Sequence, residues 1–82
     1  MKPSESLSLF RKAQRIQVAA LKKDHFVDLQ PLRKDPDTRA LSFSVYVFDP
    51  NTNLVMNHTI HGYFDLETEA AKINEITQFL GL

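Results

Sequence analysis

The sequence predicts one two-layer α+β domain over residues 1–82, in the order helix, strand, strand, strand, helix (α-β-β-β-α). The strands are expected to form a three-stranded antiparallel meander with both helices on one face. Residues 40–64 carry two alternating apolar/polar runs on either side of an Asp-Pro-Asn-Thr-Asn turn. The segments before and after this stretch carry apolar residues at helical spacing.

The first helix is expected from Ser4 or Ser6 to about Lys23, with residues 1–4 disordered. Its apolar residues recur at steps of three and four and line one side: Leu9, Phe10, Ala13, Ile16, Ala20 and Leu21. A basic arc lies roughly opposite: Arg11, Lys12, Arg15, Lys22 and Lys23.

Residues 25–34 alternate less cleanly and predict an edge strand. Val27 and Leu29 share one face, and Asp28 and Gln30 share the other. Pro31 cannot donate a hydrogen bond to a neighbouring strand, so this strand is expected at the edge of the sheet or to stop early.

The two central strands, 41–48 and 54–64, are expected to pair with their apolar residues opposite each other. This pairing matches Val47 with Leu54, Val45 with Met56, Phe43 with His58, and Leu41 with Ile60.

Two turns with similar sequences join the strands. In the loop of about four residues after Phe48, Asp49 is expected to cap the turn while Pro50 presets φ. Asn51 and Asn53 tolerate left-handed geometry there. The Asp-Pro-Asp-Thr sequence of residues 35–38 predicts a second turn of the same type.

The last helix is expected to begin after Asp65, a good N-cap, and to end before Gly81. Glu67 and Glu69 fall in its first turn, where negative charge suits the helix dipole. Its apolar face is expected to contain Leu66, Ala70, Ile73, Ile76, Thr77 and Leu80.

Composition excludes several classes of function. The chain has no cysteine, and therefore no disulfide, thiolate nucleophile or Cys-ligated zinc. It has no run of about 18 apolar residues and no signal-peptide pattern, so a cytoplasmic protein without a membrane partner is expected. Net charge is zero, but residues 1–39 carry +4 and residues 40–82 carry −4.

The sheet face left uncovered by the helices is the leading candidate site. It is expected to expose Tyr46, Phe48, Val55, Asn57, Thr59, His61 and Tyr63, beside Ser42 and Ser44. One interpretation is an ordinary solvated face. The other is a contact surface, because this much exposed aromatic and apolar area suits an interface with a second copy or another protein. Pairing along an exposed edge strand is a variant of that interpretation.

The sequence offers two further candidate sites. The basic arc of the first helix could contact nucleic-acid phosphates, or it could simply be a solvated face. His61, with Tyr63 and Tyr46, could act as an acid or base, but no partner nucleophile or paired carboxylate accompanies it. His58 and His61 are expected on opposite faces and so cannot share a metal. We therefore predict a non-enzymatic protein without metal or cofactor.

The order helix-strand-strand-strand-helix over about 70 residues resembles that of the double-stranded RNA-binding domain. The motifs of that family do not follow. Its second helix opens with paired lysines, where this chain has Asp65, Leu66 and Glu67. Its Gly-Pro-x-His loop has no counterpart in Asp35–Arg39 or Asp49–Asn53. The resemblance concerns topology, so no RNA-contacting residue is carried over.

Overall fold

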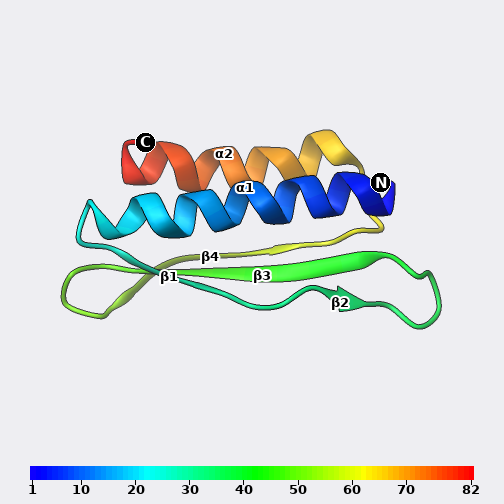
Figure 1. The fold of residues 1–82 in the computed structure, drawn as a ribbon, viewed down its shortest axis with the longest axis horizontal. Helices are drawn as coiled ribbons and strands as arrows, with labels where there is room; N and C mark the ends of the chain where they lie inside the picture. The colour runs from blue at the N-terminus through cyan, green and yellow to red at the C-terminus, as the bar shows by residue number, and fades with distance from the viewer.

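The computed structural model describes all 82 residues and arranges them in a helical layer and a sheet layer (Figure 1). The helices are α1 (Pro3–Leu21) and α2 (Leu66–Leu80). The strands are β1 (Phe26–Leu29), β2 (Arg33–Lys34), β3 (Leu41–Phe48) and β4 (Leu54–Ile60). The predicted α+β fold is confirmed.

The sheet is antiparallel and has β3 at its centre. β1 and β2 both pair with one side of β3, and β4 pairs with the other side. β1 and β2 are the two halves of the single first strand expected from sequence. The chain leaves the strand conformation at Gln30–Leu32, around Pro31, which explains four strands instead of three. The predicted order of the meander is unchanged.

The pairing of β3 with β4 differs from the prediction by two residues. Phe43 lies opposite Ile60, and Val45 lies opposite His58. Most faces remain as predicted, because a shift of two preserves the side of a residue. Leu54 is the exception: it was predicted on the helix-covered face, but it lies opposite Phe48 on the other face and is 51% exposed. The loop Asp49–Asn53 is five residues long, and Val55 is an extra residue without a partner on β3. This β-bulge and the longer loop together explain the different register.

Both turns are capped by an aspartate but differ in conformation. Asp49 Oδ1 accepts the N–H groups of Asn51 and Asn53, each at 2.9 Å. The left-handed residue is Thr52 (φ 65°), not Asn51 or Asn53 as predicted.

In the other turn, Asp35 Oδ1 accepts the N–H groups of Asp37 and Thr38, and the left-handed residue is Arg39 (φ 61°). Similar sequences therefore place the left-handed residue at the fourth position of one turn and the fifth of the other. The aspartate cap is the feature that the two turns share.

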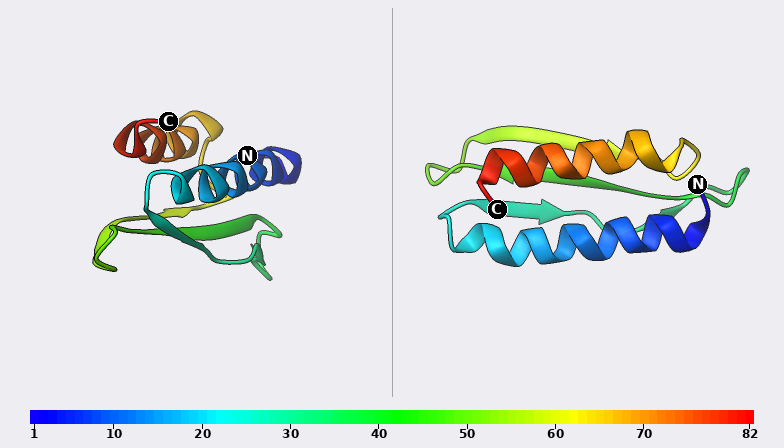
Figure 2. Two further views of the ribbon diagram at one scale, coloured as in Figure 1. Left: turned by 60° about the vertical axis from the view of Figure 1, so that its left-hand side comes forward. Right: turned by 90° about the horizontal axis from the view of Figure 1, so that it is seen from above.

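Both helices pack on the same face of the sheet, side by side and running in the same direction (Figure 2). The twelve-residue core comprises Leu9, Ala13, Ile16, Ala20, Val27, Phe43, Val45, Val47, Ile60, Ile73, Ile76 and Leu80. Leu21 and Leu66, expected on the buried sides of the helices, are exposed.

The helix ends correct one prediction and confirm two. Residues 1–4 were expected to be disordered, but α1 already begins at Pro3. Glu5 accepts the N–H of Lys2, and the amino group of Met1 donates to the carbonyl of Phe64 (2.9 Å), which ties this end to the start of α2. Asp65 caps α2 by accepting the N–H of Thr68, and Gly81 ends it in left-handed conformation (φ 70°).

Neither helix combines the length and the apolar character needed to cross a bilayer.

Candidate functional site

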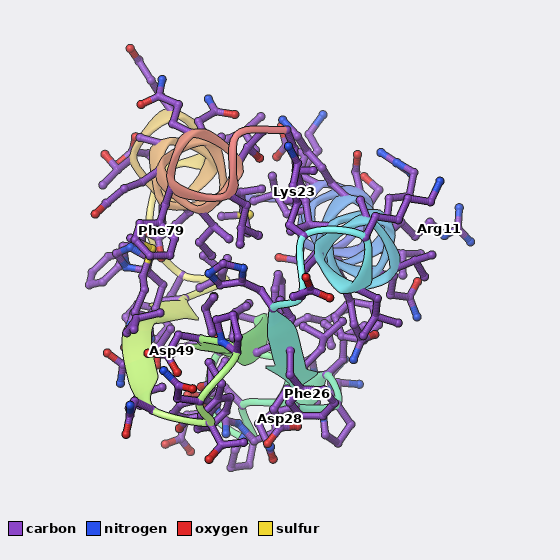
Figure 3. The ribbon with its side chains drawn as sticks, turned by 90° about the vertical axis from the view of Figure 1, so that its left-hand side faces the viewer. Arg11, Lys23, Phe26, Asp28, Asp49 and Phe79 are labelled. Carbon is purple, nitrogen blue, oxygen red and sulfur yellow. The ribbon has the colours of Figure 1, made fainter.

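The candidate site is the face of the sheet that points away from both helices, called here the open face. Strand alternation and cross-strand pairing place on it Phe26, Asp28 and Gln30 near β1, Arg33 of β2, Ser42, Ser44, Tyr46 and Phe48 of β3, and Asn57 and Thr59 of β4. Phe26 and Asp28 project from β1 on the side opposite the helices (Figure 3).

One end of the open face is aromatic. The rings of Phe26 and Phe48, paired across β1 and β3, have centroids 6.1 Å apart. Phe26 is 57% exposed. Residues paired across the strands form rows that run across the face. Tyr46 lies in the next row, between Asp28 of β1 and Asn57 of β4. Exposed aromatic side chains of this kind are enriched at protein interfaces.

The side chains in the middle of the open face are small and polar. Ser44 is buried, and its hydroxyl lies 3.1 Å from the hydroxyl of Thr59. The guanidinium of Arg33 leans toward this point, with Nη2 3.5 Å from Ser44 Oγ.

Two charges on the open face have no ion-pair partner within the chain. The ion pairs of the protein join His58 to Glu75 and Lys72 to Glu69. Asp28 accepts a hydrogen bond from the amide of Gln30 (3.1 Å) and makes no contact with a cation. The open face therefore carries an acidic group in one row and a basic group in another, both uncompensated.

The other end of the open face is a groove. It is lined by Arg33, Lys34, Asp35, Ser42, His61 and Tyr63. His61 and Tyr63 follow the end of β4, and their ring centroids lie 5.1 Å apart. Phe64 packs edge-on against both rings. The floor is held by Gly62, whose N–H donates to the Ser42 hydroxyl.

Each edge of the sheet is capped by a helix side chain. The amide of Gln17 on α1 donates to the outward carbonyl of Val27 on β1, at 2.9 Å. The ammonium of Lys72 on α2 donates to the outward carbonyl of Thr59 on β4, also at 2.9 Å. Such caps obstruct the pairing of another strand along the edge.

The residues expected at the candidate site fall into three groups. Tyr46, Phe48, Asn57 and Thr59 lie together on the open face, as the alternation predicted. His61 and Tyr63 lie in the groove beyond β4, and Val55 is the bulge residue. Sequence reasoning missed Phe26 and Arg33. The alternation of Val27 and Leu29 was the signal for Phe26, but nothing local indicated that the chain resumes pairing at Arg33.

The basic residues of the first helix lie apart from the open face. Arg11, Arg15 and Lys22 line a shallow groove along the outer side of α1, and Arg11 points away from the molecule (Figure 3). Lys12 instead donates to Asn74 of α2 (3.1 Å). Lys23 lies between the helices, near the end of α2 (Figure 3). Lys22 and Lys23 follow α1, which ends at Leu21, two residues earlier than predicted.

Two titratable groups are enclosed beneath the helices. His58 lies on the helix-covered side of β4, with Nε2 3.1 Å from Glu75 Oε2 but without hydrogen-bond geometry. Glu69 is fully buried, and its Oε1 accepts the N–H of His61 (2.6 Å) and the ammonium of Lys72 (3.0 Å). The sequence predicted Glu69 in the first turn of the helix, where it suits the dipole, and gave no sign of this role. No group of three or more His, Cys, Asp or Glu side chains is arranged to hold a metal.

Comparison of the chain with protein-family models, curated proteins and solved structures gives no match.

Proposed function

We propose that this chain is a non-enzymatic interaction module that forms a homodimer through the open face of its sheet. The observation that carries the proposal is the combination of an uncovered aromatic face with two capped edges. A second chain finds the exposed ring of Phe26 beside the half-buried rings of Phe48 and Tyr46, whereas side chains already occupy carbonyls of both edges.

The composition of the open face supports this proposal over a solvated surface. Phe26, Phe48 and Tyr46 form one contiguous aromatic end. The solvated face of a sheet normally carries polar side chains and does not require this much apolar area. The zero net charge also favours association, because copies of the chain do not repel each other strongly.

The dimensions of the face predict a weak dimer. An eight-residue central strand is about 27 Å long, and three strands span about 14 Å, so the face covers on the order of 400 Å². Specific interfaces bury about 800 Å² of accessible surface on each partner. We therefore expect dissociation constants in the micromolar range.

Sedimentation velocity between about 5 and 500 μM tests the proposal, a range set by typical weak interfaces. The wild-type chain should pass from monomer to dimer within it. Tyr46→Lys should remain monomeric, because it places an ammonium within the contact. Val18→Lys is the matched control: Val18 is 64% exposed on α1, away from the open face. A wild-type chain that remains monomeric throughout the range would refute the proposal.

The groove along α1 favours a second candidate function, weak binding of nucleic-acid phosphates. Arg11, Arg15 and Lys22 line it without ion-pair partners in the chain. Labelled DNA or RNA should shift in a gel at low salt, and the double variant Arg11→Glu/Arg15→Glu should abolish the shift. Reversal of the off-site pair Lys34→Glu/Arg39→Glu should reduce the shift much less. If the wild-type chain does not shift labelled nucleic acid at low salt, this second candidate function is wrong.

The proposal also includes the cytoplasmic location expected from sequence. His61 supports a non-enzymatic role because its ring packs against Tyr63 and Phe64, and no nucleophile is hydrogen-bonded to it. Imaging of a C-terminally tagged chain would test the location.

A further inference from the structure

We propose that the two copies pack open face to open face about a two-fold axis that runs across the strands above Ser44. In this arrangement Asp28 of each copy pairs with Arg33 of the partner subunit. The inference rests on the proposed homodimer and adds its symmetry and its register.

The unpaired charges of the open face locate the axis. Asp28 is in the row of Tyr46, and Arg33 is in the row of Ser42. These rows are four residues apart along β3, or about 14 Å, with Ser44 midway between them. A two-fold axis across the strands at Ser44 exchanges the two rows. The axis therefore brings Asp28 of each copy over the partner's Arg33. This contact occurs twice, as an interface between identical surfaces requires.

The shape of the open face agrees with this axis. The row of Tyr46 is bulky, and the row of Ser42 opens into the groove beside His61. Exchange of the rows places Tyr46 over the groove of the partner subunit. The axis passes over Ser44, whose side chain is small and buried and so does not obstruct the approach of the two faces. In these three rows the large side chain of Tyr46 therefore faces a hollow, which close packing of two sheets requires.

The other two-fold arrangement of the faces lacks this match. An axis parallel to the strands would lay each row over the same row, with β1 over the partner's β4. Asp28 would then face the partner's Asn57, and Arg33 would face the partner's His61. Both charged groups would then be removed from water without a group of opposite charge beside them, which is energetically unfavourable.

Charge reversal at the two positions tests the axis. Asp28→Arg and Arg33→Asp should each weaken the dimer by about tenfold or more, because each places like charges together twice. The double variant Asp28→Arg/Arg33→Asp should restore dimerisation. An equimolar mixture of the two single variants should form heterodimers, detectable by native mass spectrometry with one chain isotopically labelled.

Matched controls separate pairing from net charge. Glu67→Arg, on the exposed side of α2, and Arg11→Asp, on the outer side of α1, make the same charge changes in the helical layer, away from the open face. Both should dimerise like the wild type, and far-ultraviolet circular dichroism should verify that every variant is folded.

The outcomes distinguish the two proposals. If Tyr46→Lys abolishes dimerisation but neither charge reversal weakens it, the open face is the interface and the axis is wrong. If the single reversals weaken the dimer but the double variant and the mixture do not recover it, the Asp28–Arg33 pairing is wrong. If the wild-type chain is monomeric, both proposals fail.

Discussion

Three aspartates fix the backbone where the elements of this protein join. Asp35 and Asp49 cap the two turns, and Asp65 caps α2. Hydrogen bonds from the backbone N–H groups of Thr38, Asn53 and Thr68, respectively, are the main cause that lowers the pKa of each carboxyl. These N–H groups favour the charged form, so each carboxylate binds its turn most strongly when ionised.

The lowered pKa values predict acid sensitivity. The pKa of Asp49 is lower in the folded chain than in the unfolded one, so the unfolded chain binds protons first as pH falls. The stabilisation by Asp49 is therefore complete above about pH 5 and is lost as pH falls below about 4, through the folded pKa. Asp49→Asn should lower the urea midpoint at pH 7 and reduce its fall between about pH 5 and 3.

Asp37→Asn is the control for this measurement, since the Asp37 side chain accepts no hydrogen bond in the structure. A wild-type midpoint with the same pH dependence as Asp49→Asn would contradict the role of the cap.

Single residues also mark the limit of sequence reasoning. Asp49 and Asp65 were predictable because a cap bonds to its own neighbours, and local sequence contains all the partners. Glu69 was not predictable. Its carboxylate accepts the backbone N–H of His61, which lies just after the end of β4 and is eight residues earlier in the chain. This contact belongs to the tertiary structure and not to the helix. Helical position alone assigns such a residue to the surface.

At the scale of elements, the edge strands depend on the helices that cap them. β1 has only β3 as a neighbour, and Gln17 supplies a hydrogen bond to its outer side. Gln17→Ala should lower the free energy of unfolding by about 1 kcal/mol, the usual value of one such bond. It should also increase light scattering at high concentration, because the outer edge of β1 becomes available to other chains.

Gln14→Ala, on the exposed side of the same helix, is the matched control. Equal urea midpoints and equal scattering for the two variants would show that Gln17 does not protect the edge.

The register of the strands could be predicted only in part, for a physical reason. Alternation of apolar residues fixes which face each residue occupies, and this was correct for Phe43, Val45 and Val47. It does not distinguish registers that differ by two, since those bury the same faces. The loop and the bulge at Val55 decide between them, and neither follows from the apolar pattern.

At the scale of the whole molecule, the charge asymmetry between the chain halves is not neutralised by pairing. The helices lie side by side, yet no ion pair joins them. Lys12 of α1 donates instead to the neutral amide oxygen of Asn74 on α2. The basic side of α1 and the two charges of the open face therefore remain available to partners. Alternation in the sequence located the open face. The place of Arg33 on that face depends on β2, which the sequence did not separate from β1.

The two helices that close the core come from opposite ends of the chain. α2 brings Ile73, Ile76 and Leu80 to the core, so a chain cut before residue 73 keeps only one of the two helices that cover the sheet. Phe43, Val45 and Ile60 would then lie partly open to solvent, and apolar surface exposed in this way favours aggregation. Proteases should therefore degrade a chain truncated there much faster than the whole domain.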